Sequence, residues 1–219
     1  MMVETFENGE ALADAVASAI LERLSAGLAA RGHASLVATG GRSPGGVYDR
    51  LARTPLDWAH VAVTLSDERQ VDADSPNSNA RGLRERLFVG EAAAARFLPL
   101  TDYAEPALRQ LMPFDAVMLG MGEDGHVASL IPGSPVMAQA NGPALVAESP
   151  QGFGAPPVPR ISLTFAALLQ SRAIFLLIAG EAKRQVIEGA ATGPDLPVRT
   201  VLNQDRVPLR VFWAPSFEG

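Results

Sequence analysis

The stretch Ala173-Ile174-Phe175-Leu176-Leu177-Ile178-Ala179 contains only apolar residues and is followed by Gly180 and a helix-compatible segment at 181–190. A second stretch of the same kind, Asp115-Ala116-Val117-Met118-Leu119-Gly120, runs into a glycine-bearing loop. Short continuous apolar runs bounded by turn residues are typical of strands that are buried on both faces, as in a parallel sheet. These two stretches therefore predict buried parallel strands.

The same alternation of strand, turn and helix extends outward from these two segments. Further strands are predicted at 35–39, 61–65, 96–100 and 208–214, and helices at 8–31, from Ser43-Pro44 onward, at 79–88 and at 105–112. Parallel strands need crossover connections, and these crossovers place helices over the sheet. We therefore predict a single doubly wound, Rossmann-like α/β domain over residues 1–219, with a mainly parallel sheet covered by helices on both faces.

One segment interrupts this pattern. Residues 149–159 read SPQGFGAPPVP and are rich in proline and glycine, but the chain on both sides continues the same alternation. We expect a long surface loop there, not a linker between domains. Because ligands of open α/β sheets bind beyond the carboxyl ends of the strands, functional residues are expected directly after the strands.

Composition excludes several classes of protein. The 219 residues include 18 Lys and Arg against 24 Asp and Glu, a net charge of −6, which argues against a nucleic-acid partner. No apolar run approaches the roughly 20 residues of a membrane span, and the start of the chain does not resemble a signal peptide. With no cysteine there is no disulfide, thiolate nucleophile or cysteine-ligated metal. We expect a cytoplasmic protein without membrane partners.

The first strand is followed by Thr39-Gly40-Gly41-Arg42-Ser43-Pro44-Gly45-Gly46. The glycines permit close backbone approach, Ser43 is a candidate helix N-cap, and Pro44 suits the first helical position. Free amides and the helix dipole would face a phosphate, with the Ser43 hydroxyl and Arg42 as further donors. The alternative is that a strand-to-helix turn needs glycine and a cap whatever it binds. The segment matches neither the P-loop nor the dinucleotide glycine spacing.

The second strand is followed by an acidic segment that begins Ser66-Asp67-Glu68-Arg69. Asp72 and Asp74, a little further on, are expected to lie in a solvated loop. Asp67 and Arg69 stand where the ligand crevice of the sheet should open. An arginine beside carboxylates suits an anionic or sugar-like substrate.

A third loop, Gly120-Met121-Gly122-Glu123-Asp124-Gly125-His126-Val127-Ala128-Ser129-Leu130, contains one of three histidines. His126 is a candidate general base, and Asp124 is placed to fix its tautomer and stabilise the imidazolium. The alternative is a turn with a surface histidine. His33 and His60 each precede a predicted strand, so we expect them at the opposite edge of the sheet. Their spacing does not predict a metal site.

Two cations follow later in the chain. Arg160 opens the segment Arg160-Ile161-Ser162-Leu163-Thr164, and Lys183 lies in Gly180-Glu181-Ala182-Lys183, directly after the apolar strand at 173–179. Both are candidate phosphate ligands. The alternative for Lys183 is a solvent-exposed lysine in a first helical turn, where the helix dipole mildly disfavours a cation.

Taken together and in this order, these motifs resemble those of the 6-phosphogluconolactonases, within the superfamily that also contains the glucosamine-6-phosphate deaminases. The resemblance spans nearly the whole chain. It rests on TGGRSP at 39–44, SDERQV at 66–71 with SN at 78–79, LGMGEDGHVASLIPG at 119–133, RISLT at 160–164 and GEAKR at 180–184.

The resemblance implies hydrolysis of 6-phospho-D-glucono-1,5-lactone to 6-phosphogluconate in the oxidative pentose phosphate pathway, without a metal or organic cofactor. His126 would be the base and Asp124 would orient it, while Arg69, with Asp67 beside it in the catalytic set, would stabilise negative charge or position the sugar. The phosphate would be held by Gly40, Gly41, Arg42, Ser43, Arg160 and Lys183. We expect a monomer that acts on this small sugar phosphate.

The chain departs from the family pattern in two places. The deaminases carry a further catalytic glutamate a few residues after Asp-Gly-His, whereas residues 127–132 contain no acid. Val127 and Ile131 stand where the lactonases are expected to have Thr and Phe. Three alternatives remain: an isomerase or deaminase on the same scaffold, a sugar-phosphate-sensing module that binds without catalysis, and a nucleotide-binding module.

Overall fold

The fold is built on a seven-stranded sheet. The computed structural model describes residues 2–41, 43–190, 193 and 195–217. The strand order is β1-β10-β9-β6-β2-β3-β5, and every neighbouring pair is parallel. The strands are β1 (Val3–Thr5), β2 (Ala34–Ala38), β3 (Val61–Leu65), β5 (Arg96–Phe97), β6 (Ala116–Gly120), β9 (Ile174–Ala179) and β10 (Leu209–Ala214). The predicted parallel α/β sheet is confirmed.

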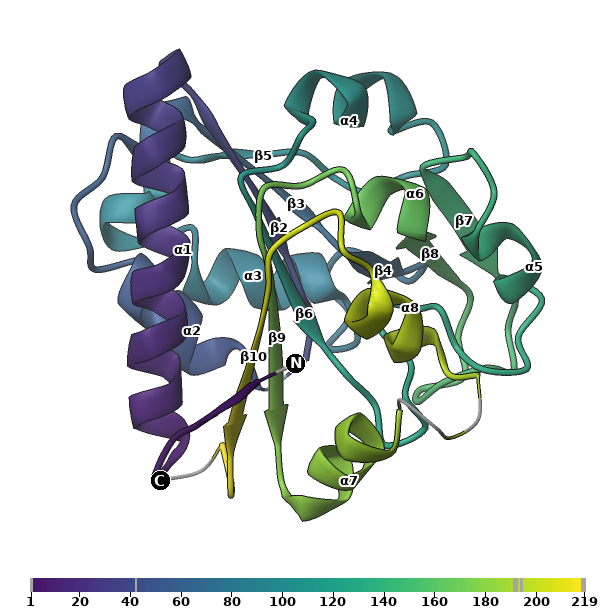
Figure 1. The fold of residues 1–219 in the computed structure, drawn as a ribbon. Helices are drawn as coiled ribbons and strands as arrows, with labels where there is room; N and C mark the ends of the chain where they lie inside the picture. The colour runs from purple at the N-terminus through teal and green to yellow at the C-terminus, as the bar shows by residue number, and fades with distance from the viewer. Residues whose placement is uncertain (1, 42, 191–192, 194, 218–219) are drawn as a thin grey trace.

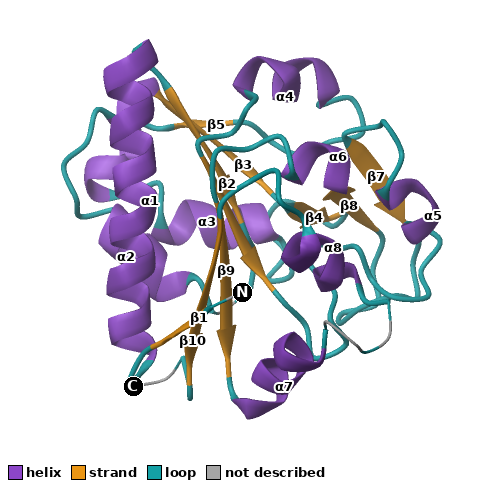
Figure 2. Ribbon diagram, viewed as in Figure 1, coloured by secondary structure: helices purple, strands orange, loops and turns teal. Residues whose placement is uncertain are grey.

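Helices cover both faces of this sheet, so that every residue of β2 and β3 is buried. The helices are α1 (Gly9–Arg31), α2 (Gly45–Leu51), α3 (Asn79–Arg86), α4 (Glu105–Leu111), α5 (Met137–Ala140), α6 (Phe165–Leu168), α7 (Glu181–Gly189) and α8 (Pro197–Asn203), with short 3-10 turns η1 (Trp58–His60) and η2 (Gly90–Ala94). Figures 1 and 2 show α1 and α2 on one side of the sheet and α4, α6 and α8 on the other. None of the helices in the described segments combines the length and hydropathy of a membrane span.

The helix α1 has clear signals at both ends. The Asn8 side chain accepts a hydrogen bond from the backbone N–H of Ala11 at 2.9 Å, which satisfies one unpaired donor of the first turn. At the other end Gly32 adopts a φ of 75°, the left-handed conformation that favours glycine. The helix therefore occupies almost the whole predicted range, and it packs against β2, β6 and β10.

A second, three-stranded antiparallel sheet was not predicted. It consists of β4 (Asp67–Arg69), β8 (Arg160–Leu163) and β7 (Val146–Ser149), in the order β4-β8-β7. The expectation that the chain on both sides of 149–159 continues the strand–helix alternation is therefore wrong, since β7 and β8 form a hairpin there. Strands of three or four residues are too short to show a periodic pattern.

Strand β5 is also shorter than predicted. It ends at Phe97, and the last hydrogen bond to β3 is donated by the Leu98 N–H to the Val63 carbonyl at 2.8 Å. The next residue, Pro99, has no N–H to donate, so the ladder stops before the predicted end at Leu100.

The sheet reverses its winding direction between β2 and β6. From β2 the chain continues outward to β3 and β5, and it then returns to β6 on the other side of β2 before reaching β9 and β10. At such a reversal the loops after the two neighbouring strands diverge and open a crevice. Residues 39–41 and 43–44, which follow β2, and the loop at 121–130 therefore meet at the carboxyl edge of the sheet.

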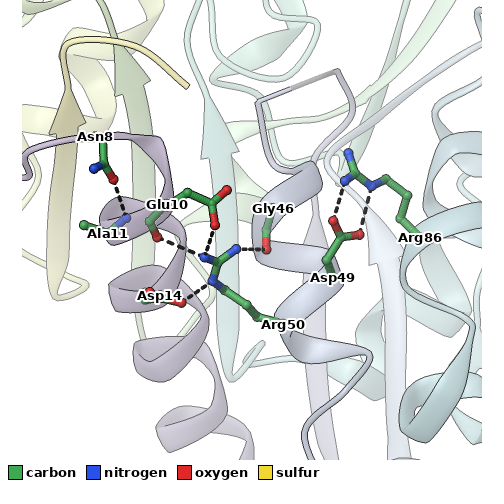
Figure 3. Close-up of polar contacts among 8 residues, drawn as sticks. All are labelled: Asn8, Glu10, Ala11, Asp14, Gly46, Asp49, Arg50 and Arg86. Carbon is green, nitrogen blue, oxygen red and sulfur yellow. Dashed lines mark hydrogen bonds and ion pairs between the residues drawn. The ribbon is translucent and has the colours of Figure 1, made fainter. Parts of the chain in front are cut away.

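Ion pairs hold α2 between its neighbours, as Figure 3 shows. The Arg50 guanidinium of α2 pairs with Asp14 and, at 2.7 Å, with Glu10 of α1. On the other side of α2, Asp49 accepts from Arg86 of α3, with Nε at 3.0 Å. These contacts fix α2, the helix that directly follows the glycine-rich segment.

Candidate active site

A cavity of about 240 Å³ lies at the carboxyl edge, where the loops that follow β2 and β6 diverge. Its walls come from both sheets. Eight of the ten site residues predicted from the sequence line it: Gly40, Gly41, Ser43, Asp67, Arg69, His126, Arg160 and Lys183. Of the other two, Asp124 contacts His126, and Arg42 lies outside the described residues.

The pair His126 and Asp124 has the geometry of an oriented base. The His126 Nδ1 lies 2.6 Å from the Asp124 Oδ1, and the backbone N–H of His126 donates to the same oxygen at 3.2 Å. The carboxylate favours the tautomer with a proton on Nδ1, which leaves Nε2 as the basic nitrogen. The His126 side chain is 31% exposed, so water and substrate can reach it. His33 and His60 are exposed and directly precede β2 and β3, as predicted.

The loop that carries this pair is tied at both ends. The Gly122 N–H donates to the His126 carbonyl at 3.0 Å, and the Gly125 N–H donates to the Gly122 carbonyl at 3.0 Å. Gly125 has a φ of 77°, and its carbonyl accepts from the N–H of Val198 in α8 at 2.9 Å. The imidazole is thus carried by a short closed turn that is anchored to a helix.

Asp67 is buried at the start of β4. One carboxylate oxygen, Oδ1, accepts from the Ser66 hydroxyl at 3.1 Å, and the other, Oδ2, accepts from the Ser129 hydroxyl at 2.6 Å. Its backbone carbonyl accepts from the Asn79 side-chain amide at 2.9 Å. The carboxylate is therefore held in one orientation, next to the cavity.

Two arginines stand side by side in the second sheet, where Arg69 of β4 is the register partner of Arg160 of β8. Arg160 is 3% exposed; its Nη2 donates to the Pro156 carbonyl at 2.8 Å, while its Nε has no partner among the described residues. Burial, together with the nearby charge of Arg69, lowers the pKa of Arg160, and Asp67 opposes this shift. A buried cation with an unused donor indicates a site for an anion.

Lys183 adds a third positive charge to the cavity. It makes no hydrogen bond or ion pair with any described residue. Burial lowers the pKa of its ammonium group, against the opposing charges of Glu123 and Asp124. The interpretation as a solvent-exposed lysine is therefore wrong, because the side chain is partly buried against the cavity.

The glycine-rich turn differs in one detail from the prediction. Helix α2 begins at Gly45 with Pro44 as its N-cap, so Ser43 does not cap it. The first helical hydrogen bond runs from the Tyr48 N–H to the Pro44 carbonyl at 3.0 Å, which leaves the Ser43 hydroxyl outside the helix and at the cavity wall. Gly41 has a φ of 93°, which explains glycine at that position.

Two polar residues next to the predicted site residues, Glu68 and Ser129, were missed from the sequence. The Glu68 carboxylate accepts from the backbone N–H groups of Asn79 and Ala80, both at 2.7 Å, and thereby caps α3. It lies ten residues before the N-cap Ser78, so no local capping motif signals it. Ser129, the second missed residue, sits inside the quoted histidine loop. In the described part of the chain, no group of three or more acidic or histidine side chains is arranged to hold a metal ion.

Comparison with known proteins gives a consistent result. The family model described as "Glucosamine-6-phosphate isomerases/6-phosphogluconolactonase" matches residues 7–213. A 6-phosphogluconolactonase of Caulobacter vibrioides is 41% identical, with 97% of each chain covered. A 6-phosphogluconolactonase of Rhizobium meliloti is 38% identical, with 96% of this chain and 97% of that protein covered.

Solved structures agree with these relatives. A 6-phosphogluconolactonase from Shewanella baltica superposes with a TM-score of 0.91 at 37% identity, covering 98% of both chains. A monomeric glucosamine-6-phosphate deaminase, with a TM-score of 0.75 at 20% identity over 98% of this chain and 97% of that one, shares the fold. The chain therefore belongs to the glucosamine-6-phosphate isomerase/6-phosphogluconolactonase family, and within it to the lactone-hydrolysing 6-phosphogluconolactonases.

Proposed function

We propose that this protein hydrolyses 6-phospho-D-glucono-1,5-lactone to 6-phospho-D-gluconate, as a cytoplasmic monomer. One observation carries the proposal: the oriented His126–Asp124 pair shares a single cavity with Arg69, Arg160 and Lys183. A base in the walls of a cavity, together with cations that form no ion pair with the described residues, suits a phosphorylated electrophile. Both sheets contribute to this cavity, which supports treating residues 1–219 as one domain.

In this proposal His126 acts twice. Its Nε2 removes a proton from a water molecule as the water oxygen bonds to the lactone carbonyl carbon, C1. The imidazolium then gives that proton to the ring oxygen as the bond between C1 and the ring oxygen breaks. Asp124 keeps the proton on Nδ1 and stabilises the imidazolium between these steps. The atoms balance without a covalent enzyme intermediate.

The cations hold the other end of the substrate. Arg160 and Lys183, with Ser43 and the backbone of Gly40 and Gly41, would bind the phosphate, and Arg42 is proposed to join them. Arg69 would position the sugar or stabilise charge on the carbonyl oxygen. Asp67 would serve as the buried counter-charge of the two arginines. Because a lactone is an activated ester, binding energy from the remote phosphate supplies much of the catalysis through positioning.

The test is a lactonase assay at neutral pH. The lactone is generated in situ from glucose 6-phosphate by a separate dehydrogenase, and its disappearance is compared with the spontaneous rate. We expect His126→Ala to lower kcat by about 10²- to 10⁴-fold, the usual contribution of a general base. His60→Ala is the matched control, since His60 also pairs through Nδ1 with a carboxylate, that of Asp57 at 2.9 Å, but lies outside the cavity.

The alternatives give different results in parallel assays. A deaminase would release ammonia from glucosamine 6-phosphate, and we expect none because residues 127–132 supply no acid for the additional proton transfers. A sensing module would bind 6-phosphogluconate while the lactone disappeared at the background rate. That second outcome would refute the proposed function.

A further inference from the structure

Ser129 has two charged partners that the proposed mechanism treats separately. It is fully buried, three residues after His126. Its hydroxyl donates to the Asp67 Oδ2 at 2.6 Å and accepts from the Arg160 Nη1 at 3.4 Å. A hydroxyl has one proton and two lone pairs, so it can serve an anion and a cation at once. Ser129 therefore stands between the carboxylate and the guanidinium.

The backbone fixes this hydroxyl in place. The Ser129 N–H donates to the Ser162 hydroxyl of β8 at 3.1 Å. The preceding residue, Ala128, has a φ of 51°, and it is the one residue other than glycine with a positive φ in the described ranges. The chain also closes a tight turn here, since the Leu130 N–H donates to the Val127 carbonyl at 3.0 Å. A positive φ costs free energy in a residue other than glycine, so it persists only where the surrounding structure holds the turn.

The position of Arg160 depends on few contacts. Its guanidinium is held by the Pro156 carbonyl, at 2.8 Å, and by Ser129. No ion pair joins it to Asp67 among the described residues, although the negative charge of Asp67 acts on it. In a buried environment, opposite charges attract strongly. The Ser129 hydroxyl bonds to both groups, so it bridges the carboxylate and the guanidinium.

We propose that Ser129 is a positioning residue for phosphate selectivity. It keeps Arg160 apart from Asp67, so that the guanidinium stays available to the phosphate of the substrate. This inference rests on the proposed lactonase function. Without the hydroxyl, Arg160 pairs directly with Asp67, and the enzyme loses its preference for a phosphorylated lactone while retaining its base.

The experiment measures that preference. We compare kcat/KM for 6-phosphogluconolactone with kcat/KM for unphosphorylated glucono-1,5-lactone in the wild type, in Ser129→Ala and in Ser129→Cys. In Ser129→Ala the ratio of the two values falls about tenfold to a hundredfold, the effect expected from one hydrogen bond to a charged group. The ratio falls because KM for the phosphorylated lactone rises. Ser129→Cys has a weak S–H donor, so its ratio lies between those of the wild type and Ser129→Ala. Hydrolysis of glucono-1,5-lactone stays within about twofold of wild type.

A double-mutant cycle separates positioning from a general structural effect. In an Arg160→Met background, Ser129→Ala should change the ratio no further, because the hydroxyl acts through Arg160. Ser134→Ala is the matched control, since Ser134 is also buried but pairs with the Ser149 hydroxyl at 2.9 Å, away from the cavity walls. A parallel fall for both lactones in Ser129→Ala would overturn the inference.

A binding measurement keeps this test independent of activity. Calorimetric titration with 6-phosphogluconate and with gluconate gives the same preference as a ratio of dissociation constants. If the wild type hydrolyses neither lactone, the proposed function fails, but a lower binding ratio in Ser129→Ala would still support the role of Ser129. If the wild type is active and both ratios are unchanged in Ser129→Ala, the inference about Ser129 fails alone.

Discussion

The His126–Asp124 pair leaves no room for a side chain at Gly122. A Cβ atom at this position would lie 2.5 Å from the Asp124 Oδ1 and would overlap the His126 ring. We expect Gly122→Ala to displace the imidazole by about an ångström and to lower kcat about a hundredfold, because misplacement on this scale disrupts the reacting geometry. Steady-state assays with a thermal unfolding curve would check this.

Gly120→Ala is the control for that variant. Gly120 also lines the cavity, but a Cβ atom there would meet nothing within 4 Å. Its kcat should therefore remain close to wild type. Equal losses in the two variants would show that an added methyl group in the cavity, and not contact with the histidine pair, causes the effect.

Lys183 gives a prediction about pH. Burial lowers the pKa of its ammonium group, so the charge is present below that lowered pKa and is lost as the pH rises through it. The affinity for 6-phosphogluconate should then decline before the pH reaches about 10.4, the usual lysine value. Titrations from about pH 7.5 upward would follow this decline, and Lys183→Arg should abolish it because a guanidinium stays protonated. The same decline in Lys183→Arg would assign it to another group.

At the residue scale, the sequence identifies groups whose chemistry shows in their type and place. His126 and Lys183 follow predicted strands, and both line the cavity. Ser129 could not be recognised in this way, because a serine in an apolar stretch has many ordinary roles. Its importance depends on Asp67 and Arg160, which are distant in the sequence and meet only through the pairing of β4 with β8.

Strand β4 and helix α3 depend on each other through Glu68. Its carboxylate accepts from the first two backbone N–H groups of α3 and from the Ser78 hydroxyl at 3.2 Å. We expect Glu68→Ala to destabilise the protein by about 1–3 kcal/mol, because buried donors lose a charged acceptor. KM should rise as well, since Asp67 and Arg69 flank Glu68 on the same strand.

Chemical denaturation and substrate titration of Glu68→Ala would test this. Glu85→Ala is the control, because Glu85 is on the same helix but forms an exposed pair with Arg81, and exposed pairs contribute little to stability. A Glu68→Ala protein as stable as Glu85→Ala would show that the carboxylate is not a significant cap.

Among the helices and strands, the longer ones can be predicted from the sequence and the shortest cannot. The apolar segment of β9 and the 23 residues of α1 carry enough pattern to be recognised alone. Strand β4, with the sequence Asp-Glu-Arg, has no apolar pattern and forms because β8 pairs with it. The second sheet, which supplies Asp67, Arg69 and Arg160, therefore becomes visible only in the folded protein.

For the whole molecule, the carboxyl end of the sheet contains the cavity, whereas the amino end contains a buried ion-pair cluster that stabilises the fold. Asp115 is buried at the amino end, where its carboxylate accepts from the Ser35 N–H at 3.0 Å and pairs with Arg31 and Arg172. We expect Asp115→Ala to lower the free energy of unfolding by about 1–3 kcal/mol, because the Ser35 donor loses a buried acceptor. Both arginines are partly exposed and can be hydrated again.

Asp115→Ala should reduce stability without reducing activity, whereas Asp124→Asn should reduce activity without reducing stability. Asp115→Ala should lower the melting temperature by about 2–10 °C and leave kcat/KM unchanged at 25 °C. Asp124→Asn should leave the melting temperature unchanged and lower kcat, because Asp124 is half-exposed and orients the base. A loss of activity in folded Asp115→Ala would show that the two ends are coupled.

The position of β1 beside β10 affects the order in which the sheet is completed during translation. Among the described strands, β1 is made before the others, yet its hydrogen-bonding partner, β10 at residues 209–214, is made after them. While the ribosome is still synthesising the chain, the segment that becomes β1 has no neighbour, whereas β2 and β3 can already pair. Nascent chains that stop before β10 would therefore contain a partly formed sheet with an open edge at β9, which is a site for chaperone binding or aggregation.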